Sequence, residues 1–328
     1  MRVGVAGVGY LGTFHAEKYR VLSGVRLMGV HDSDMERGQR LADTLGVRFH
    51  PRLETLVDAV EALSIAVPTV HHHAIARYCL TRGRHCLLEK PIAETVEQAA
   101  ELIRLAGRHG AVLQVGHLER FNPVLGSLAS GGGKVRHIQT ARHGPCRQRG
   151  LDVDVVLDLM IHDIDIVLSL NPGPVTVLGA TGAAVLGRHW DVASAQLRFA
   201  DGTSAHLSAS RLADTTERWL RVYERGCYLC LDYTAQTVTI HHCRDGGPAQ
   251  RVETVGGPRE DLLRRQLQDF LTCVRTGQSP RVGGEAALRA LRVAEVIRQR
   301  LRGVGDGHHA SVLLGPVAQA DGGAATAD

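Results

Sequence analysis

Four polar side chains with acid–base chemistry recur along one apolar segment in the second half of the chain. Within residues 153–166, Asp154, Asp158, His162 and Asp165 follow one another at spacings of four, four and three residues. On a helix these spacings put the side chains on one face, where burial demands hydrogen-bond partners or a wet cleft. Asp158 can raise the proton affinity of His162 and orient its ring for proton transfer. The alternative is a partly exposed, capped helix with a merely hydrogen-bonded histidine, and the spacing matches no zinc motif.

Lys90 is the second residue whose type and position indicate chemistry. Lysine and arginine total 38, yet lysine occurs only at positions 18, 90 and 134. Lys90 stands between Glu89 and Pro91, directly after a predicted strand at 85–88. Because ligands of open α/β sheets bind beyond the carboxyl ends of the strands, we expect its ammonium at a cofactor cleft. There it can bind a substrate hydroxyl and stabilise developing alkoxide charge, whereas the alternative is a solvated surface lysine.

A glycine pattern near the N-terminus predicts a dinucleotide site. Gly7, Gly9 and Gly12 follow a predicted strand at 2–6 and open a predicted helix, and Asp32 ends the next strand, 20 residues after Gly12. Such a loop permits a tight turn, a close approach of pyrophosphate and a free helix N-terminus for the phosphates. Asp32 would bind the ribose hydroxyls and repel a 2′-phosphate, which favours NAD over NADP. The alternatives are a glycine turn without a ligand and a surface aspartate in a turn.

Two scaffolds must position these groups. Before about residue 120, predicted strands at 2–6, 25–31, 62–67, 85–88 and 112–115 alternate with helices, which indicates an α/β fold with a parallel sheet. We therefore predict an N-terminal Rossmann dinucleotide-binding domain over residues 1–120. Later strands, predicted at 135–143, 175–181, 193–199, 204–211, 217–224, 227–232 and 237–243, indicate a C-terminal α+β domain with a large, mainly antiparallel open sheet over residues 121–303. Helices at 260–276 and 284–302 can pack back on the first domain, and residues 304–328 are expected to form a flexible tail.

Composition narrows the class of protein. The 328 residues are 44% hydrophobic and 22% charged with a net charge of +4, which is typical of a globular chain and disfavours nucleic-acid or membrane partners. No stretch approaches the ~18 apolar residues of a membrane span, and the N-terminus runs into a strand pattern instead of a secretion signal. Seven scattered cysteines then indicate cytosolic thiols and a cytoplasmic protein. Cys227-x-x-Cys230 lies in a strand pattern, so we expect core or edge thiols and no metal.

Together, these motifs resemble the glucose–fructose oxidoreductase / inositol dehydrogenase (Gfo/Idh/MocA) family over about residues 1–300. In that family a lysine, an aspartate and a histidine form the catalytic set, and these roles fall on Lys90, Asp158 and His162. Many members have glycine two residues before the histidine, where this chain has Met160. The resemblance is carried by Gly7-Val8-Gly9-Tyr10-Leu11-Gly12, Val67-Pro68-Thr69 with His72, Glu89-Lys90-Pro91, Gly116-His117 with Arg120-Phe121-Asn122-Pro123, and Asp158-Leu159-Met160-Ile161-His162.

The resemblance also implies which residues meet the ligands. The cofactor NAD would contact Gly7, Gly9, Tyr10, Leu11, Gly12, Asp32, Pro68, Thr69, His72, Glu89 and Lys90. The substrate would contact His117, Arg120, Phe121, Asn122, Arg149 and Asp165. The family further implies a homo-oligomer, either a dimer or a tetramer.

A narrower resemblance, carried by residues 115–123 and 158–165, is to the subgroup that oxidises the 3-hydroxyl of UDP-N-acetylglucosamine to a ketone. An aminotransferase then aminates that ketone for lipid A precursors. His162 would be the base, oriented by Asp158, with Lys90 holding the hydroxyl, although Lys90 and His162 can exchange roles. The alternatives are a dehydrogenase of a free polyol such as myo-inositol and a non-catalytic NAD-binding regulator.

A nucleotide-sugar also needs a diphosphate site. Arg142, His143, Arg147 and Arg149 lie between the first strand of the second domain and the catalytic helix, and they can clamp phosphates. In a chain this rich in arginine, a solvated loop is an equal alternative.

Overall fold

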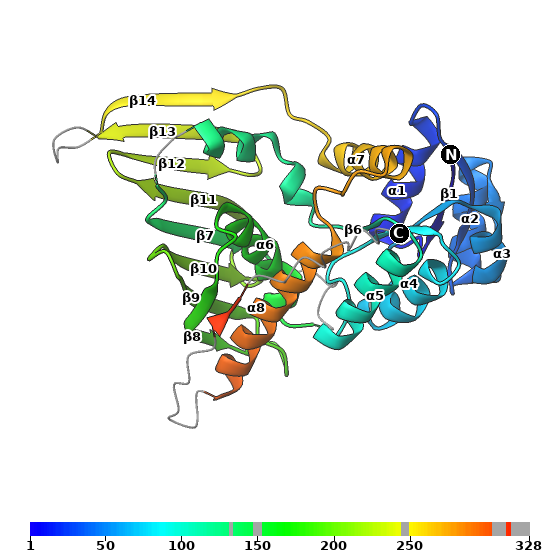
Figure 1. Cartoon of the computed structure of the whole chain (residues 1–328), viewed down its shortest axis with the longest axis horizontal. Helices are drawn as coiled ribbons and strands as arrows, with labels where there is room; N and C mark the ends of the chain where they lie inside the picture. Colours follow the sequence, from blue (N-terminus) through cyan, green and yellow to red (C-terminus); the bar gives the residue numbers. More distant parts are fainter. Residues whose placement is uncertain (131–133, 147–152, 244–248, 304–312, 316–328) are drawn as a thin grey trace, which may run out of the picture.

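Two sheets and the helices around them make up the computed structural model of the chain, which describes residues 1–130, 134–146, 153–243, 249–303 and 313–315. Figure 1 shows the first sheet with its helices at one end of the molecule and a larger sheet at the other. Helices from the end of the chain run between them. The arrangement leaves the two halves facing each other, and the functional residues lie where they meet.

The first sheet is parallel and has six strands in the order β3-β2-β1-β4-β5-β6. Its central strands are buried on both faces, which explains their near-continuous apolar sequence. The strands are β1 (Arg2–Ala6), β2 (Arg26–His31), β3 (Arg48–Phe49), β4 (Ala62–Ile65), β5 (His85–Leu88) and β6 (Leu113–Val115). The helices are α1 (Tyr10–Val21), α2 (Met35–Leu45), α3 (Leu53–Ala59), α4 (His72–Leu80) and α5 (Val96–Arg108). The predicted Rossmann sheet is confirmed.

The second sheet has nine strands in the order β14-β13-β12-β11-β7-β10-β9-β8-β15. Only β7 and β10 run parallel, so the predicted mainly antiparallel sheet is also confirmed. The strands are β7 (His137–His143), β8 (Val175–Ala183), β9 (Val192–Phe199), β10 (Ser204–Ser210), β11 (Glu217–Glu224), β12 (Cys227–Asp232), β13 (Thr237–Cys243), β14 (Ala249–Gly256) and β15 (Leu313–Leu314).

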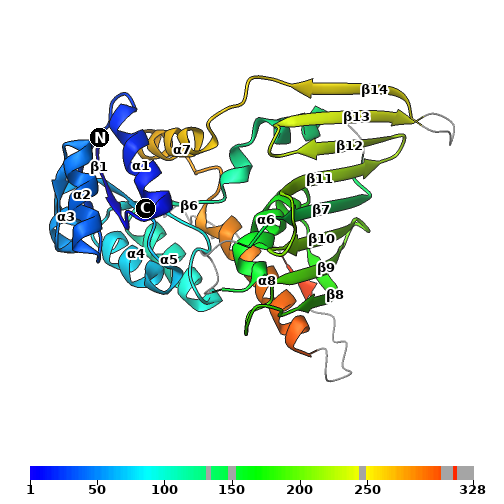
Figure 2. The ribbon, with the colours of Figure 1, turned by 180° about the vertical axis from the view of Figure 1, so that it is seen from behind.

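Three helices join the sheets. The segment at 153–170 forms a π turn, η4 (Val156–Met160), followed by α6 (Ile161–Leu170). Helix α8 (Gly284–Arg302) packs against α6, β8 and α5, and α7 (Leu262–Thr276) packs against α1. Figures 1 and 2 show α6 and α8 on the face of the large sheet that is turned toward the first domain. Helix α8 therefore packs on both halves, whereas α7 packs on the first half.

Several elements differ from the sequence prediction. The short β3 and α3 lie where no element was predicted, because neither is long enough to show a period. Strand β14 was also missed. Most of the tail predicted to be flexible, residues 304–328, lies outside the described residues, but Leu313–Leu314 pair with β8 as an edge strand. No helix in the described ranges is both long and apolar enough to cross a bilayer.

Candidate active site

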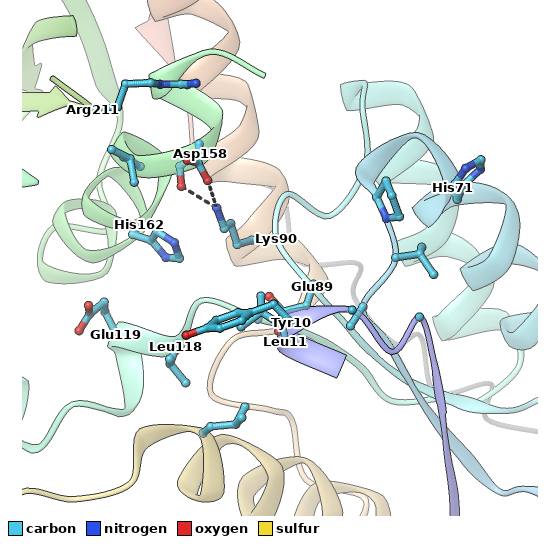
Figure 3. Close-up of a pocket in the computed structure, with 18 of the residues that line it drawn as sticks. Tyr10, Leu11, His71, Glu89, Lys90, Leu118, Glu119, Asp158, His162 and Arg211 are labelled. Carbon is cyan, nitrogen blue, oxygen red and sulfur yellow. Dashed lines mark hydrogen bonds and ion pairs between the residues drawn. The ribbon is translucent and has the colours of Figure 1, made fainter. Parts of the chain in front are cut away.

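A cavity of about 850 Å³ lies between the two halves. Its walls combine the glycine loop, the end of β5 and the start of α4 from the first sheet with η4, α6 and the ends of β7, β10 and β11 from the second half. Figure 3 shows Lys90, His162, Tyr10 and Glu89 reaching the same space from these different elements. Residues more than 60 positions apart in the sequence therefore share one site.

The glycine loop has the geometry that a dinucleotide requires. Gly7 has a φ of +81°, and a Cβ there would lie 2.7 Å from the Ala66 carbonyl oxygen. A Cβ on Gly12 would lie 1.7 Å from the Gly7 carbonyl oxygen, so only glycine allows α1 to pack so closely. Around Gly9, by contrast, a Cβ would meet nothing within 4 Å, and the N-terminus of α1 carries no side-chain cap. The helix N-terminus without a side-chain cap and the empty space around Gly9 fit a pyrophosphate.

Asp32 lies at the end of β2 beside the loop and is almost fully buried. Its Oδ2 accepts hydrogen bonds from Val8 N at 2.7 Å and Arg37 Nε at 3.2 Å, and its Oδ1 accepts from Asp34 N at 2.8 Å and Arg37 Nη2 at 2.7 Å. Burial alone would raise the pKa of this carboxyl, but the bonds from Arg37, Asp34 and Val8 lower it. Asp32 is therefore a fixed carboxylate at the predicted ribose position.

Lys90 links the two halves across the cavity. Its Nζ donates to the backbone oxygen of Asp158 at 2.5 Å and to Asp158 Oδ1 at 3.1 Å (Figure 3). Asp158 lies in the π turn η4, in which Ile161 N bonds to Val156 O, five residues back. The orienting contact that we predicted between Asp158 and His162 is absent from the described residues. Asp158 holds the ammonium instead.

His162 faces the cavity from the first turn of α6. Its Nδ1 is buried without a hydrogen-bond partner, and its ring meets that of His117 edge-on at 5.9 Å. Burial, and then the positive charge of Lys90, hold the pKa of His162 well below its usual range. The imidazole is therefore neutral at pH 7 and able to accept a proton.

Two arginines of helix α8 contact the segment that carries Asp158 and His162, one near each end of that segment. Asp154, on the predicted polar stripe, does not line the cavity: its Oδ1 accepts from Val156 N and Leu157 N at 3.1 Å each, and its Oδ2 accepts from Arg298 Nε at 2.6 Å. At the far end, Arg289 Nη1 donates to Leu168 O at 3.2 Å. Asp154 therefore caps the start of this segment, as the alternative of a capped helix expects, and takes no part in the cavity.

Arg142 is the centre of a buried ion-pair cluster. Its guanidinium donates to both carboxylate oxygens of Asp163, at 2.9 and 3.1 Å, and to Glu119 Oε1 at 3.1 Å. Burial alone would lower the pKa of Arg142, but the two carboxylates raise it. Because two acids already neutralise Arg142, it does not fit the predicted phosphate clamp. Arg147 and Arg149, the other arginines of that prediction, lie outside the described residues.

The structure separates the remaining predicted residues into two groups. Gly7, Gly9, Tyr10, Leu11, Asp32, Pro68, Glu89, Lys90, Asp158 and His162 line the cavity. Among the described residues, Gly12, Thr69, His72, His117, Arg120, Phe121, Asn122 and Asp165 do not line it.

Those that do not line the cavity support its walls. His72 places its ring nitrogens 2.8 Å from Pro91 O and 2.9 Å from Val67 O, which braces the loops after β4 and β5. Arg120 Nη1 donates to Asp165 Oδ1 at 3.2 Å, and Asn122 Nδ2 donates to Tyr233 O at 3.2 Å. Their place is behind the wall, so the predicted direct contacts of these side chains with a ligand remain predictions without support from this geometry.

Sequence reasoning missed several cavity residues. Arg211 follows β10, Thr216 precedes β11 and Arg218 lies on it, and all three line the second-domain side of the cavity. Arg37, in the first turn of α2, lines the first-domain side. One signal was present for Arg37, since it lies five residues after Asp32 at the start of a predicted helix. The other three carry no motif and come together only through the strand order β11-β7-β10.

Comparisons with known proteins agree with this architecture. Residues 1–117 match the model of the GFO/IDH/MocA oxidoreductase family, NAD-binding Rossmann fold, and residues 130–226 match the GFO/IDH/MocA C-terminal domain. UDP-N-acetylglucosamine 3-dehydrogenase of Acidithiobacillus ferrooxidans is 36% identical over 91% of this chain and 96% of that protein. A solved structure of that enzyme superimposes with a TM-score of 0.86, covering 92% of this chain and 98% of the other. Myo-inositol 2-dehydrogenase of Thermotoga maritima is 24% identical over 92% of this chain and 96% of that protein. The chain therefore belongs to the Gfo/Idh/MocA family of NAD-binding oxidoreductases.

Proposed function

We propose that this protein oxidises the 3-hydroxyl of UDP-N-acetylglucosamine to a ketone with NAD. The observation that carries the proposal is the meeting of Lys90 and His162 on one cavity beside the glycine loop (Figure 3). The 36% identity to a UDP-N-acetylglucosamine 3-dehydrogenase, over nearly the whole length of both chains, supports the choice of substrate. When bound, NAD supplies the hydride acceptor.

The chain's own residues divide the work on the hydroxyl group. The Lys90 ammonium binds the hydroxyl oxygen and stabilises the alkoxide as it forms, and Asp158 holds the ammonium in place. The hydroxyl proton passes to His162, whose neutral ring is ready to accept it. We assign Nε2 as the acceptor, because Nδ1 is fully buried. Lys90 takes the binding role because its ammonium is already held at the cavity by the Asp158 carbonyl and carboxylate oxygens.

The diphosphate of the substrate would lie against the second-domain wall. Thr216 and Arg218 line that wall. Arg211 lines it too, but it is already held by Val153 O and by Asp191, as Arg142 is held by its two acids. Guanidinium groups at a cavity wall suit phosphate oxygens. Arg149 remains a proposed contact outside the described residues. We expect Arg218→Gln to raise the KM for UDP-N-acetylglucosamine while NADH binding stays unchanged.

A dehydrogenase of free polyols is the second candidate, favoured by the likeness to myo-inositol 2-dehydrogenase. NADH formation separates the two, with UDP-N-acetylglucosamine and myo-inositol compared at equal concentration and a ketone trap present to pull the equilibrium. Turnover of the nucleotide-sugar alone supports the proposal, whereas turnover of myo-inositol alone contradicts it. The non-catalytic regulator is not retained, because the chain belongs to an oxidoreductase family and has Lys90 and His162 in one cavity.

The proposed product and the outer sheet face suggest partners. A 3-keto sugar is a substrate for an aminotransferase, which fits the expected route to 3-amino lipid A precursors in the cytoplasm. The rings of Tyr223 and Tyr228 lie 5.9 Å apart and those of Tyr228 and His241 lie 4.2 Å apart, on the face of the large sheet opposite to the one that buries Val222 and Leu229. We propose this face as the contact of a homo-oligomer. Light scattering of the purified protein tests for a dimer or tetramer.

A further inference from the structure

Asp32, the carboxylate at the predicted ribose site, already accepts four hydrogen bonds in this structure. A carboxylate offers about four acceptor positions. Val8 N and Asp34 N take one position on each oxygen of Asp32, and the Arg37 guanidinium takes the other on each, through Nε and Nη2. The two backbone bonds belong to the glycine loop and to the turn after β2, so they persist as long as the fold does.

Ribose hydroxyls therefore compete with Arg37. Two hydroxyl groups can donate to Asp32 only where the two Arg37 bonds have been released. The Asp32 side chain is 3% exposed, which leaves little room for a ligand beside the bound guanidinium, whereas the Arg37 side chain is 45% exposed and free to turn outward. A second acid is within reach, because Asp34 Oδ2 lies 3.4 Å from Arg37 Nη1. Arg37 can therefore leave Asp32 and still keep an acidic partner, Asp34.

We propose that Arg37 determines the cofactor selectivity of this enzyme by acting as a movable partner of Asp32. In the free protein it occupies the ribose site, so NAD must displace it and binds less tightly than the pocket would otherwise allow. Once displaced, its guanidinium stays beside the 2′-position of the ribose, where it is a counter-ion for a 2′-phosphate. Arg37 thereby offsets the repulsion between Asp32 and NADP. The chain accepts NADP better than Asp32 alone would permit.

Equilibrium binding of NADH and NADPH tests this, read from nicotinamide fluorescence without any substrate. Arg37→Gln removes the guanidinium, and Arg40→Gln is the matched control, because Arg40 lies on the same helix and pairs with the exposed Glu36. We expect Arg37→Gln to tighten NADH binding up to about fivefold, the equivalent of a weak ion pair. We expect it to weaken NADPH binding about tenfold through loss of a charge-assisted contact. Arg40→Gln should leave the dissociation constants of NADH and NADPH within about twofold of the wild-type values.

Arg37→Lys provides a second variant should Arg37→Gln fold poorly. It keeps the charge but cannot form the two-point bond, so NADPH binding should stay close to the wild type while NADH binding tightens. The proposal is overturned if Arg37→Gln leaves the ratio of the two dissociation constants unchanged. It is equally overturned if either variant weakens NADH as much as NADPH, since Arg37 would then support cofactor binding in general. These readouts do not depend on the sugar substrate.

Discussion

Arg298 offers the sharpest test of how the fold holds its catalytic segment. Its Nε lies 2.6 Å from Asp154 Oδ2, and the Asp154 side chain is only 4% exposed. Arg298→Gln leaves that carboxylate buried with its two amide partners alone. Removing one member of a buried pair costs about 3–5 kcal/mol. Because the Arg298 side chain is 19% exposed and both amide bonds to Asp154 remain, we expect about 2–3 kcal/mol here.

The assay combines urea unfolding with steady-state kinetics under conditions in which the variant is folded. We expect kcat to fall as well, because Asp154 caps the turn that leads into Asp158 and His162. Arg302→Gln, at the exposed end of the same helix, is the control and should change neither measurement. Asp154→Asn completes a double-mutant cycle, since in its background the loss of Arg298 should cost less than about 1 kcal/mol. An equal cost in both backgrounds would refute the reasoning.

Three further outcomes follow from the site. Lys90→Met should lower kcat by about 10²–10³-fold and leave NADH binding intact. Lys18→Met, which removes a surface ion pair to Asp261, is the control. If kcat falls less than about tenfold, Lys90 takes no part in the reaction. Gly9→Ala should keep the melting temperature but weaken NADH binding, since a methyl group there contacts no protein atom and fills the open space of the loop. Burial lowers the pKa of His72 and of His117, so the unfolded chain takes up protons first. The free energy of unfolding should therefore fall as pH drops below about 6.5, by up to ~1.4 kcal/mol per pH unit for each, and His117→Gln should reduce that slope in urea titrations.

The sequence predicted the parts of this site that depend on local pattern. A glycine loop between a strand and a helix, with Asp32 after the next strand, has a fixed geometry, and the structure reproduces it in detail at Gly7 and Gly12. Lys90 was predictable for the same reason, because the carboxyl end of a parallel strand has a known place in a sheet. Strand and helix bounds were close for the long elements that were predicted, although the eight-residue β14 was missed.

What the sequence could not show was which polar groups neutralise one another. Helical spacing placed Asp154, Asp158 and His162 on one face, but the partners of the two aspartates come from α8 and from the first domain, far away in the chain. A π turn also has no sequence signature in this segment, and Asp158, whose carbonyl oxygen accepts from Lys90, lies in this turn. Arg211 and Arg218 became neighbours of the cavity only through the strand order of the second sheet.

Two arginines of this chain have a structural role in the catalytic segment. Arg142 with Asp163 and Arg298 with Asp154 each fix an acid of the catalytic segment, and the planar guanidinium suits such contacts because it presents several donors in one rigid fork. The two guanidinium groups are fixed by these ion pairs, so they do not bind the reacting hydroxyl. Lys90 differs, because its ammonium is a compact charge with three donors, of which Asp158 takes up two. The third donor is what a substrate hydroxyl requires, so in this architecture arginine holds the segment and lysine is reserved for the reacting oxygen.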